Sequence, residues 1–160
     1  MRWLGVATLA AGSVLATSSL AGAARTTTPH WLTQSNSACR DARRGRAAVI
    51  AEVSHLPSKT ARKTLLRILS GTAHVETGLL AQLRRVDPPA SVSAAFDRAL
   101  VLLETRHIED ARLIVRLERR WNASLLERQT RRDRFINVRL VHVWQGLRAA
   151  ACVSYFRVLR

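Results

Sequence analysis

Hydrophobic positions recur with a helical period along most of the chain, in four successive amphipathic segments. In the first, residues 38–55, the side chains of Ala42, Val49 and Val53 fall on one face at 100° per residue. The second segment runs from about 58 to 86, the third from about 90 to 120, and the fourth from about 123 to just beyond 152. No segment alternates with the period of a strand, so the pattern predicts an all-α fold.

Prolines mark two of the three connections between these helices. Pro57 ends the first helix, and the consecutive Pro88 and Pro89 cannot continue the second. The third and fourth helices lack such a break, so we place their turn at residues 121–123, with residues 129–133 as the alternative. Long helices joined by short turns indicate an antiparallel up-down-up-down four-helix bundle. A long helical hairpin with shorter flanking helices is the other arrangement that fits.

The N-terminus has the pattern of an export signal. A positive start, Met1-Arg2, precedes an uncharged apolar run over residues 3–20 and the small residues Ala21-Gly22-Ala23. We therefore predict a signal peptide over residues 1–24, cleaved after residue 23 or 24, and a secreted or extracytoplasmic protein. A retained membrane anchor is the alternative. Residues 25–37 are polar and aperiodic, which predicts a flexible leader before a single helical domain over 38–160.

The chain has two cysteines, Cys39 at the start of the first predicted helix and Cys152 near the end of the fourth. The polar leader separates Cys39 from the apolar run, which a lipoprotein cysteine must follow directly. Haem attachment needs two nearby cysteines followed by His, which this chain lacks. In an up-down-up-down bundle the two cysteines lie at the same end, so we predict a disulfide between them. Closing a loop of about 113 residues stabilises a fold by about 4 to 5 kcal/mol.

Several short motifs accompany the cysteines. Leu-Pro (56–57) precedes the second helix, Pro-Pro-Ala (88–90) precedes the third, and Gly-Leu-Arg-Ala-Ala-Ala-Cys (146–152) lies near the C-terminus. Over residues 39–152 this pattern resembles small uncharacterised exported helical proteins of actinobacteria, some of which are lipoproteins. The resemblance implies no activity. Because this chain lacks the lipoprotein motif, we expect no lipid anchor on Cys39.

Polar residues interrupt the apolar stripes of two helices. Glu76 lies on the stripe of the second helix, and His107 and Asp110 lie three apart on that of the third. We interpret them as a polar layer that fixes helix register, with an arginine of the fourth helix such as Arg132 as partner. The alternative is a small-ligand or metal site centred on these three residues. Glu-x-x-His occurs twice, at 52–55 and 104–107, but the two motifs lie at different heights along the helices.

Charge provides the remaining functional signal. The chain carries 26 Lys and Arg against 11 Asp and Glu, a net charge of +15. Nine of the basic residues flank the start of the second helix and the turn between the third and fourth: Lys59, Arg62, Lys63, Arg116, Arg119, Arg120, Arg128, Arg131 and Arg132. We expect these cations to bind anionic envelope polymers or lipid headgroups, with peripheral membrane contact. No nucleic-acid recognition motif is present, so we expect no specific nucleic-acid partner.

No catalytic motif occurs in the sequence. It contains no Gly-rich phosphate loop, no Gly-x-Ser-x-Gly elbow and no zinc-ligand pattern. We therefore predict a non-enzymatic protein without a cofactor that acts at the cell envelope through its basic surface.

Overall fold

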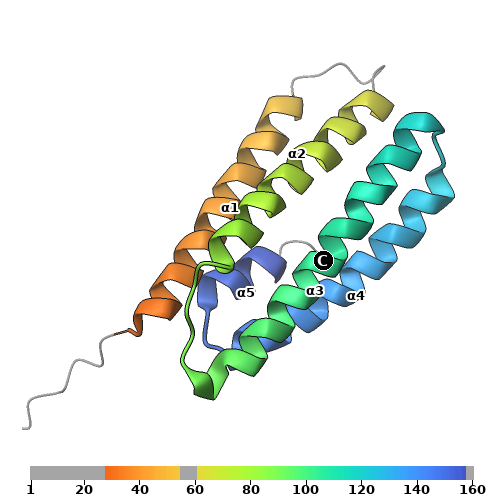
Figure 1. The fold of residues 1–160 in the computed structure, drawn as a ribbon. Helices are drawn as coiled ribbons and strands as arrows, with labels where there is room; N and C mark the ends of the chain where they lie inside the picture. The colour runs from red at the N-terminus through yellow and green to blue at the C-terminus, as the bar shows by residue number, and fades with distance from the viewer. Residues whose placement is uncertain (1–27, 55–60, 158–160) are drawn as a thin grey trace, which may run out of the picture.

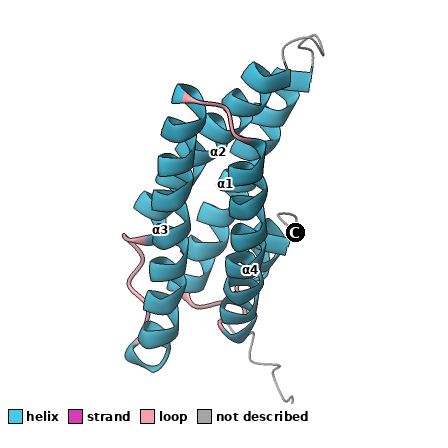
Figure 2. Ribbon diagram, turned by 90° about the vertical axis from the view of Figure 1, so that its right-hand side faces the viewer, coloured by secondary structure: helices cyan, strands magenta, loops and turns pink. Residues whose placement is uncertain are grey.

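The computed structural model describes residues 28–54 and 61–157, and these form five helices (Figure 1). The helices are α1 (His30–Ser54), α2 (Ala61–Leu83), α3 (Ala90–Arg119), α4 (Ala123–Gly146) and α5 (Ala150–Arg157). No strand occurs among the described residues (Figure 2). The predicted all-α class is confirmed, whereas the predicted number of four helices is wrong. The predicted signal peptide over residues 1–24 and the connection at Pro57 lie outside the described residues.

Helix α1 begins at His30, so the predicted start at residue 38 is too late. Pro29 starts the helix, because its carbonyl accepts from the backbone N–H groups of Leu32 at 3.0 Å and Thr33 at 3.1 Å. Packing then overrides the polar composition that suggested a flexible leader. The ring of Trp31 meets that of Phe96 edge to face at 6.4 Å, and Ser35 is buried. Residues 30–37 therefore belong to the folded domain.

A break after Gly146 divides the predicted fourth helix into α4 and α5. Arg148 adopts a left-handed conformation with φ 58°, which turns the chain out of the helical path. The N–H of Ala149 then donates to the carbonyl of Trp144 at 3.0 Å. Leu147 and Ala149 are both buried, so the break is packed into the core. Cys152 consequently lies on α5, and the prediction of one helix running past it is wrong.

The five helices contact one another in the order of the chain. Helix α1 packs on α2, α2 on α3 and α3 on α4, while α5 packs on both α4 and α1 (Figures 1 and 2). No Cα atoms of α1 and α4 approach within 8 Å in the described part of the chain. The short α5 therefore connects α1 and α4 over part of their length.

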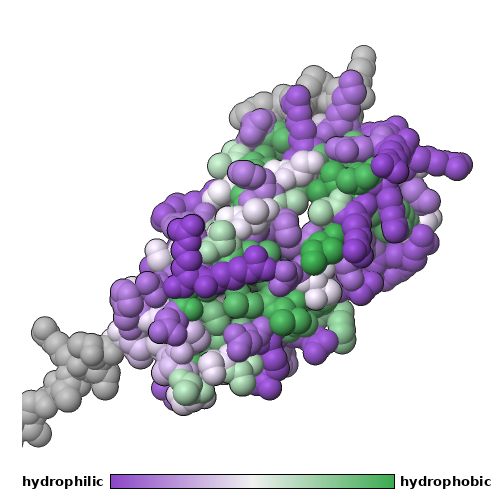
Figure 3. All heavy atoms as spheres, viewed as in Figure 1, coloured by the Kyte–Doolittle hydropathy of each residue, from purple (hydrophilic) through white to green (hydrophobic). Residues whose placement is uncertain are grey.

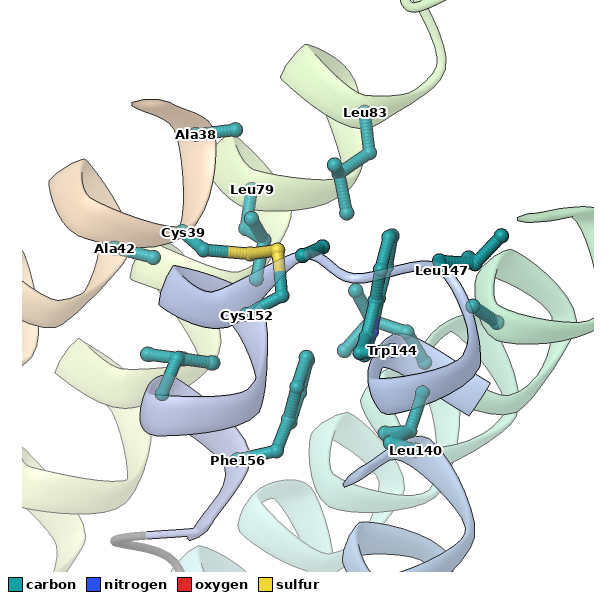
Figure 4. Packing of buried hydrophobic residues seen from close by; sticks show 14 of the residues in the cluster. Ala38, Cys39, Ala42, Leu79, Leu83, Leu140, Trp144, Leu147, Cys152 and Phe156 are labelled. Atoms are coloured by element: carbon teal, nitrogen blue, oxygen red, sulfur yellow. A yellow bond between two sulfur atoms is a disulfide. The ribbon is translucent and has the colours of Figure 1, made fainter. Parts of the chain in front are cut away.

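The apolar core surrounds the contact of α5 with α1 and α4 (Figure 4). Cys39 of α1 and Cys152 of α5 form a disulfide there, with their Cα atoms 5.0 Å apart. Both cysteines are fully buried in the cluster that includes Trp144 and Phe156. The predicted disulfide is thus confirmed, and it fixes the C-terminal helix to the first helix.

Candidate functional site

The turn between α3 and α4 consists of residues 120–122 (Figure 2). The side chain of Asn122 accepts a hydrogen bond from the backbone N–H of Leu125 at 2.9 Å and so caps the start of α4. The turn predicted at residues 121–123 is confirmed, and the alternative at 129–133 lies inside α4. The cap therefore fixes the residue at which α4 and its arginines begin.

Arg62 connects the start of α2 to this turn. Its guanidinium donates to the carbonyls of Leu117 at 3.2 Å and Glu118 at 3.5 Å, at the C-terminal end of α3. The same group lies over the ring of Trp121, 5.7 Å from the ring centroid. The structure therefore brings the basic residues of α2, α3 and α4 to one end of the molecule. Lys59, which was predicted for this surface, lies outside the described residues.

We call this surface the arginine-rich end, and its described members are Arg62, Lys63, Arg116, Arg119, Arg120, Arg128, Arg131 and Arg132. Two of them have carboxylate partners: Arg131 pairs with Glu127 at 2.8 Å and Arg132 with Glu109 at 2.5 Å. Five form no ion pair with a described residue and are exposed: Lys63, Arg116, Arg119, Arg120 and Arg128. Hydrophilic side chains project from this end in Figure 3.

Exposed apolar side chains accompany the arginines along α3 and α4. Val101, Ile108 and Val115 follow one another at intervals of seven on α3, so they share one face. On α4, Phe135 is 64% exposed and Val138 lies with Val101 in an open groove between the two helices. This face was not predicted from the sequence, because every apolar stripe was assigned to the core.

A second group of polar residues lies inside the protein. Glu76 of α2 is 1% exposed and forms an ion pair with Arg106 of α3, which is itself 2% exposed. Arg106 also donates to the side chain of Asn137 on α4 and lies over the ring of Phe156 on α5. The predicted partner, Arg132, is wrong, because Arg132 pairs with Glu109 instead. Arg106 therefore joins α3 to three other helices.

Two carboxylates lie beside this ion pair. Asp110 is 3.9 Å from Nε of Arg106. The side-chain amide of Gln129 donates to Asp110 at 3.3 Å and to Asp133 at 2.8 Å. Burial, followed by the neighbouring Asp110 carboxylate, raises the pKa of Asp133 from 3.8 to about 7. Burial also raises the pKa of Asp110, although the positive charge of Arg106 opposes that shift.

His107 belongs to a different contact from Glu76 and Asp110. Its Nε2 lies 3.3 Å from the hydroxyl of Thr77 on α2, and burial, followed by the charge of Arg106, lowers the pKa of its imidazole. Glu104, one turn earlier, pairs with Arg84 at 2.7 Å. The structure thus brings two of the three predicted polar-core residues, Glu76 and Asp110, to Arg106 and places His107 at the α2–α3 contact.

A cavity of about 170 Å³ opens beside Arg106. Helices α1, α2, α3 and α4 all contribute to its lining, and Phe156 of α5 lies against Arg106. We call this cavity the central cleft, and its ionisable lining residues are Arg46, Glu76, Arg106, Asp110 and Asp133. Only two of these five, Glu76 and Asp110, were predicted from the apolar stripes.

Comparisons with known proteins add no assignment. No family model matches the chain, and no curated protein or solved structure is significantly similar to it. The resemblance to exported actinobacterial proteins therefore stays a prediction. Within residues 28–54 and 61–157, no helix has the length and hydrophobicity needed to cross a membrane. The same residues contain no group of three His, Cys, Asp or Glu side chains arranged to hold a metal ion.

Proposed function

We propose that this protein is an exported, non-enzymatic basic protein that docks on anionic polymers or lipid headgroups of the cell envelope. The docking surface is the arginine-rich end. The observation that carries the proposal is the set of five exposed cations there without a carboxylate partner among the described residues. Such uncompensated cations attract phosphate and carboxylate groups, each contributing about 1 kcal/mol near an anionic membrane.

The scaffold in this proposal is an up-down-up-down arrangement of α1 to α4. Support comes from the contact of each helix with its neighbour in sequence and from the short turn at residues 120–122. In such an arrangement the start of α2 and the α3–α4 turn lie together, as the contacts of Arg62 with Leu117 and Trp121 require. The basic segments of three helices then act as one surface.

Export is supported by the apolar N-terminal segment and by the disulfide. Disulfides persist in oxidising compartments outside the cytoplasm. The Cys39–Cys152 bond also removes both thiols of the chain from nucleophilic chemistry. A binding role therefore suits the chain better than thiol catalysis.

The exposed apolar residues on α3 favour lipid headgroups over a soluble polymer. Val101, Ile108 and Val115 form an apolar stripe along this helix. At 100° per residue, Arg112 falls 40° from Ile108 and Arg119 falls 40° from Val115, so cations stand directly beside the stripe. An apolar stripe flanked by arginines is typical of surfaces that lie in a membrane interface.

Vesicle co-sedimentation tests the proposal. We expect binding to vesicles with anionic headgroups at about 20 mM salt, weaker binding at about 300 mM salt, and none to vesicles of neutral phosphatidylcholine. Arg119→Ser/Arg120→Ser should weaken binding several-fold. Arg40→Ser/Arg85→Ser removes the same charge from exposed positions outside the arginine-rich end and should bind like the unmodified protein.

Polyphosphate in solution distinguishes the two anion sources. Binding to polyphosphate but not to anionic vesicles assigns the surface to polymers. Binding to neither at low salt refutes the docking proposal.

A further inference from the structure

The central cleft combines opposite charges in a small space. Arg46 comes from α1, Glu76 from α2, Arg106 and Asp110 from α3, and Asp133 from α4. Three carboxylates thus share the cleft with two guanidinium groups. An apolar wall from α2 completes it, formed by Ile68, Leu69 and Ala73. The cleft therefore offers charged groups of both signs and an apolar surface that suits a short hydrocarbon chain.

Buried polar atoms around the cleft lack hydrogen-bond partners among the described residues. Oε2 of Glu76 is an unused acceptor, although its side chain is almost fully buried. Nη1 of Arg46 and Nε of Arg106 are unused donors. Because buried polar groups in native proteins are normally hydrogen-bonded, these atoms are open to hydrogen bonds with a polar occupant of the cleft.

The cleft lining carries an acidic pair of residues and an arginine without an acidic partner among the described residues. Asp110 and Asp133 lie near each other, where Gln129 donates to both carboxylates. Two neighbouring carboxylates favour a cation beside them, and an ammonium group has three N–H donors for such a site. Arg46 forms no ion pair with a described residue, so its charge is open to an anionic group.

We propose that the central cleft binds a small zwitterion, with its ammonium group at Asp110 and Asp133 and its carboxylate at Arg46. A cavity of about 150 Å³ holds benzene, so the cleft, at about 170 Å³, fits roughly six to eight non-hydrogen atoms. This site is separate from the arginine-rich end and does not depend on docking there.

The surrounding charges predict how pH affects this binding. Asp133 faces Asp110 and Arg106 of α3, while Glu76, Arg46 and Tyr155 supply the titratable groups of α2, α1 and α5. Arg106 already forms an ion pair with Glu76 and a hydrogen bond to Asn137, so its charge is partly compensated. An ammonium group needs ionised carboxylates, and we expect affinity to rise between about pH 6 and pH 8.

Isothermal titration calorimetry of the full folded protein at about pH 8 provides the test. The probes are 3-aminopropanoate, 4-aminobutanoate and 5-aminopentanoate, compared with butylamine and butanoate. We expect saturable binding of at least one zwitterion, about tenfold tighter than either singly charged probe. Asp133→Asn and Arg46→Gln should each weaken it about tenfold or more.

Matched controls distinguish binding in the cleft from an effect of the protein's overall charge. Asp97→Asn and Arg40→Gln make the same changes at exposed positions and should leave affinity unchanged. If Asp133→Asn does not fold, as judged by circular dichroism, Asp110→Asn replaces it. The proposal is wrong if none of the three zwitterions binds, if butylamine binds as tightly as they do, or if the cleft variants retain full affinity.

Discussion

Arg106 of α3 and Glu76 of α2 form an ion pair in the protein interior, with side chains 3% and 2% exposed. Removing both charges from water costs several kcal/mol per ion, which their attraction and hydrogen bonds must offset. Arg106 also donates to the side-chain oxygen of Asn137 and lies near Asp110, so one guanidinium compensates polar groups on three helices. The stability of the fold therefore depends on both partners being present.

Arg106→Met should lower the free energy of unfolding by about 3 to 5 kcal/mol, because it leaves Glu76 charged and buried without a partner. The double variant Glu76→Leu/Arg106→Met should regain much of that loss. Urea unfolding monitored by circular dichroism measures both. An Arg106→Met protein as stable as the unmodified one would contradict this role for the pair.

The pH dependence of stability should reveal the titration of the Asp133 side chain. Its pKa is raised from 3.8 to about 7 on folding, so the folded state binds more protons than the unfolded state between these values. Asp133 therefore makes stability fall as pH rises from about 4 to about 7. Asp133→Asn should raise the Tm by several degrees at pH 8 and have little effect near pH 4. An equal effect at both pH values would rule out this titration.

Breaking the disulfide should destabilise the protein strongly. Cys39→Ala/Cys152→Ala opens a loop with a sequence separation of 113 residues and should lower the free energy of unfolding by about 4 kcal/mol. Guanidinium unfolding measures this change. Intact-mass analysis with a thiol reagent supplies the control, since the unmodified protein should show no free thiol. Reagent labelling of Cys39 in the native protein would contradict the bond.

Periodicity and prolines were enough to predict α2, α3 and the cysteine pairing, because those features depend on local sequence and chain order. The start of α1 was not predictable in this way, since the contact of Trp31 with Phe96 joins residues far apart in sequence. At the break before α5, Arg148 adopts a left-handed conformation. Glycine adopts this conformation far more readily than arginine, so an arginine in the sequence does not predict it. Gly146, two residues earlier, was the only local signal.

The central cleft was only partly visible in the sequence. Arg106 lies three residues after Leu103 and four before Asp110, which is the spacing of a core-facing position. Arginines are seldom fully buried, so this position does not stand out from the many arginines on the surface. Its partners Glu76 and Asn137 come from two other helices, so only the assembled fold shows why its charge is tolerated.

Two glycines of α2 should respond oppositely to the same substitution. A Cβ atom at Gly71 would lie 2.7 Å from Cγ1 of Val49 on α1, whereas one at Gly78 would meet nothing within 4 Å. Gly78→Ala should therefore gain about 1 kcal/mol from helix propensity. Gly71→Ala should lose about 1 to 2 kcal/mol, because the stiff valine cannot move aside without repacking α1 against α2. Thermal unfolding of both variants measures the difference. Adding Val49→Ala to Gly71→Ala should relieve the clash, and a stabilised Gly71→Ala protein would show that α1 and α2 are not packed this closely.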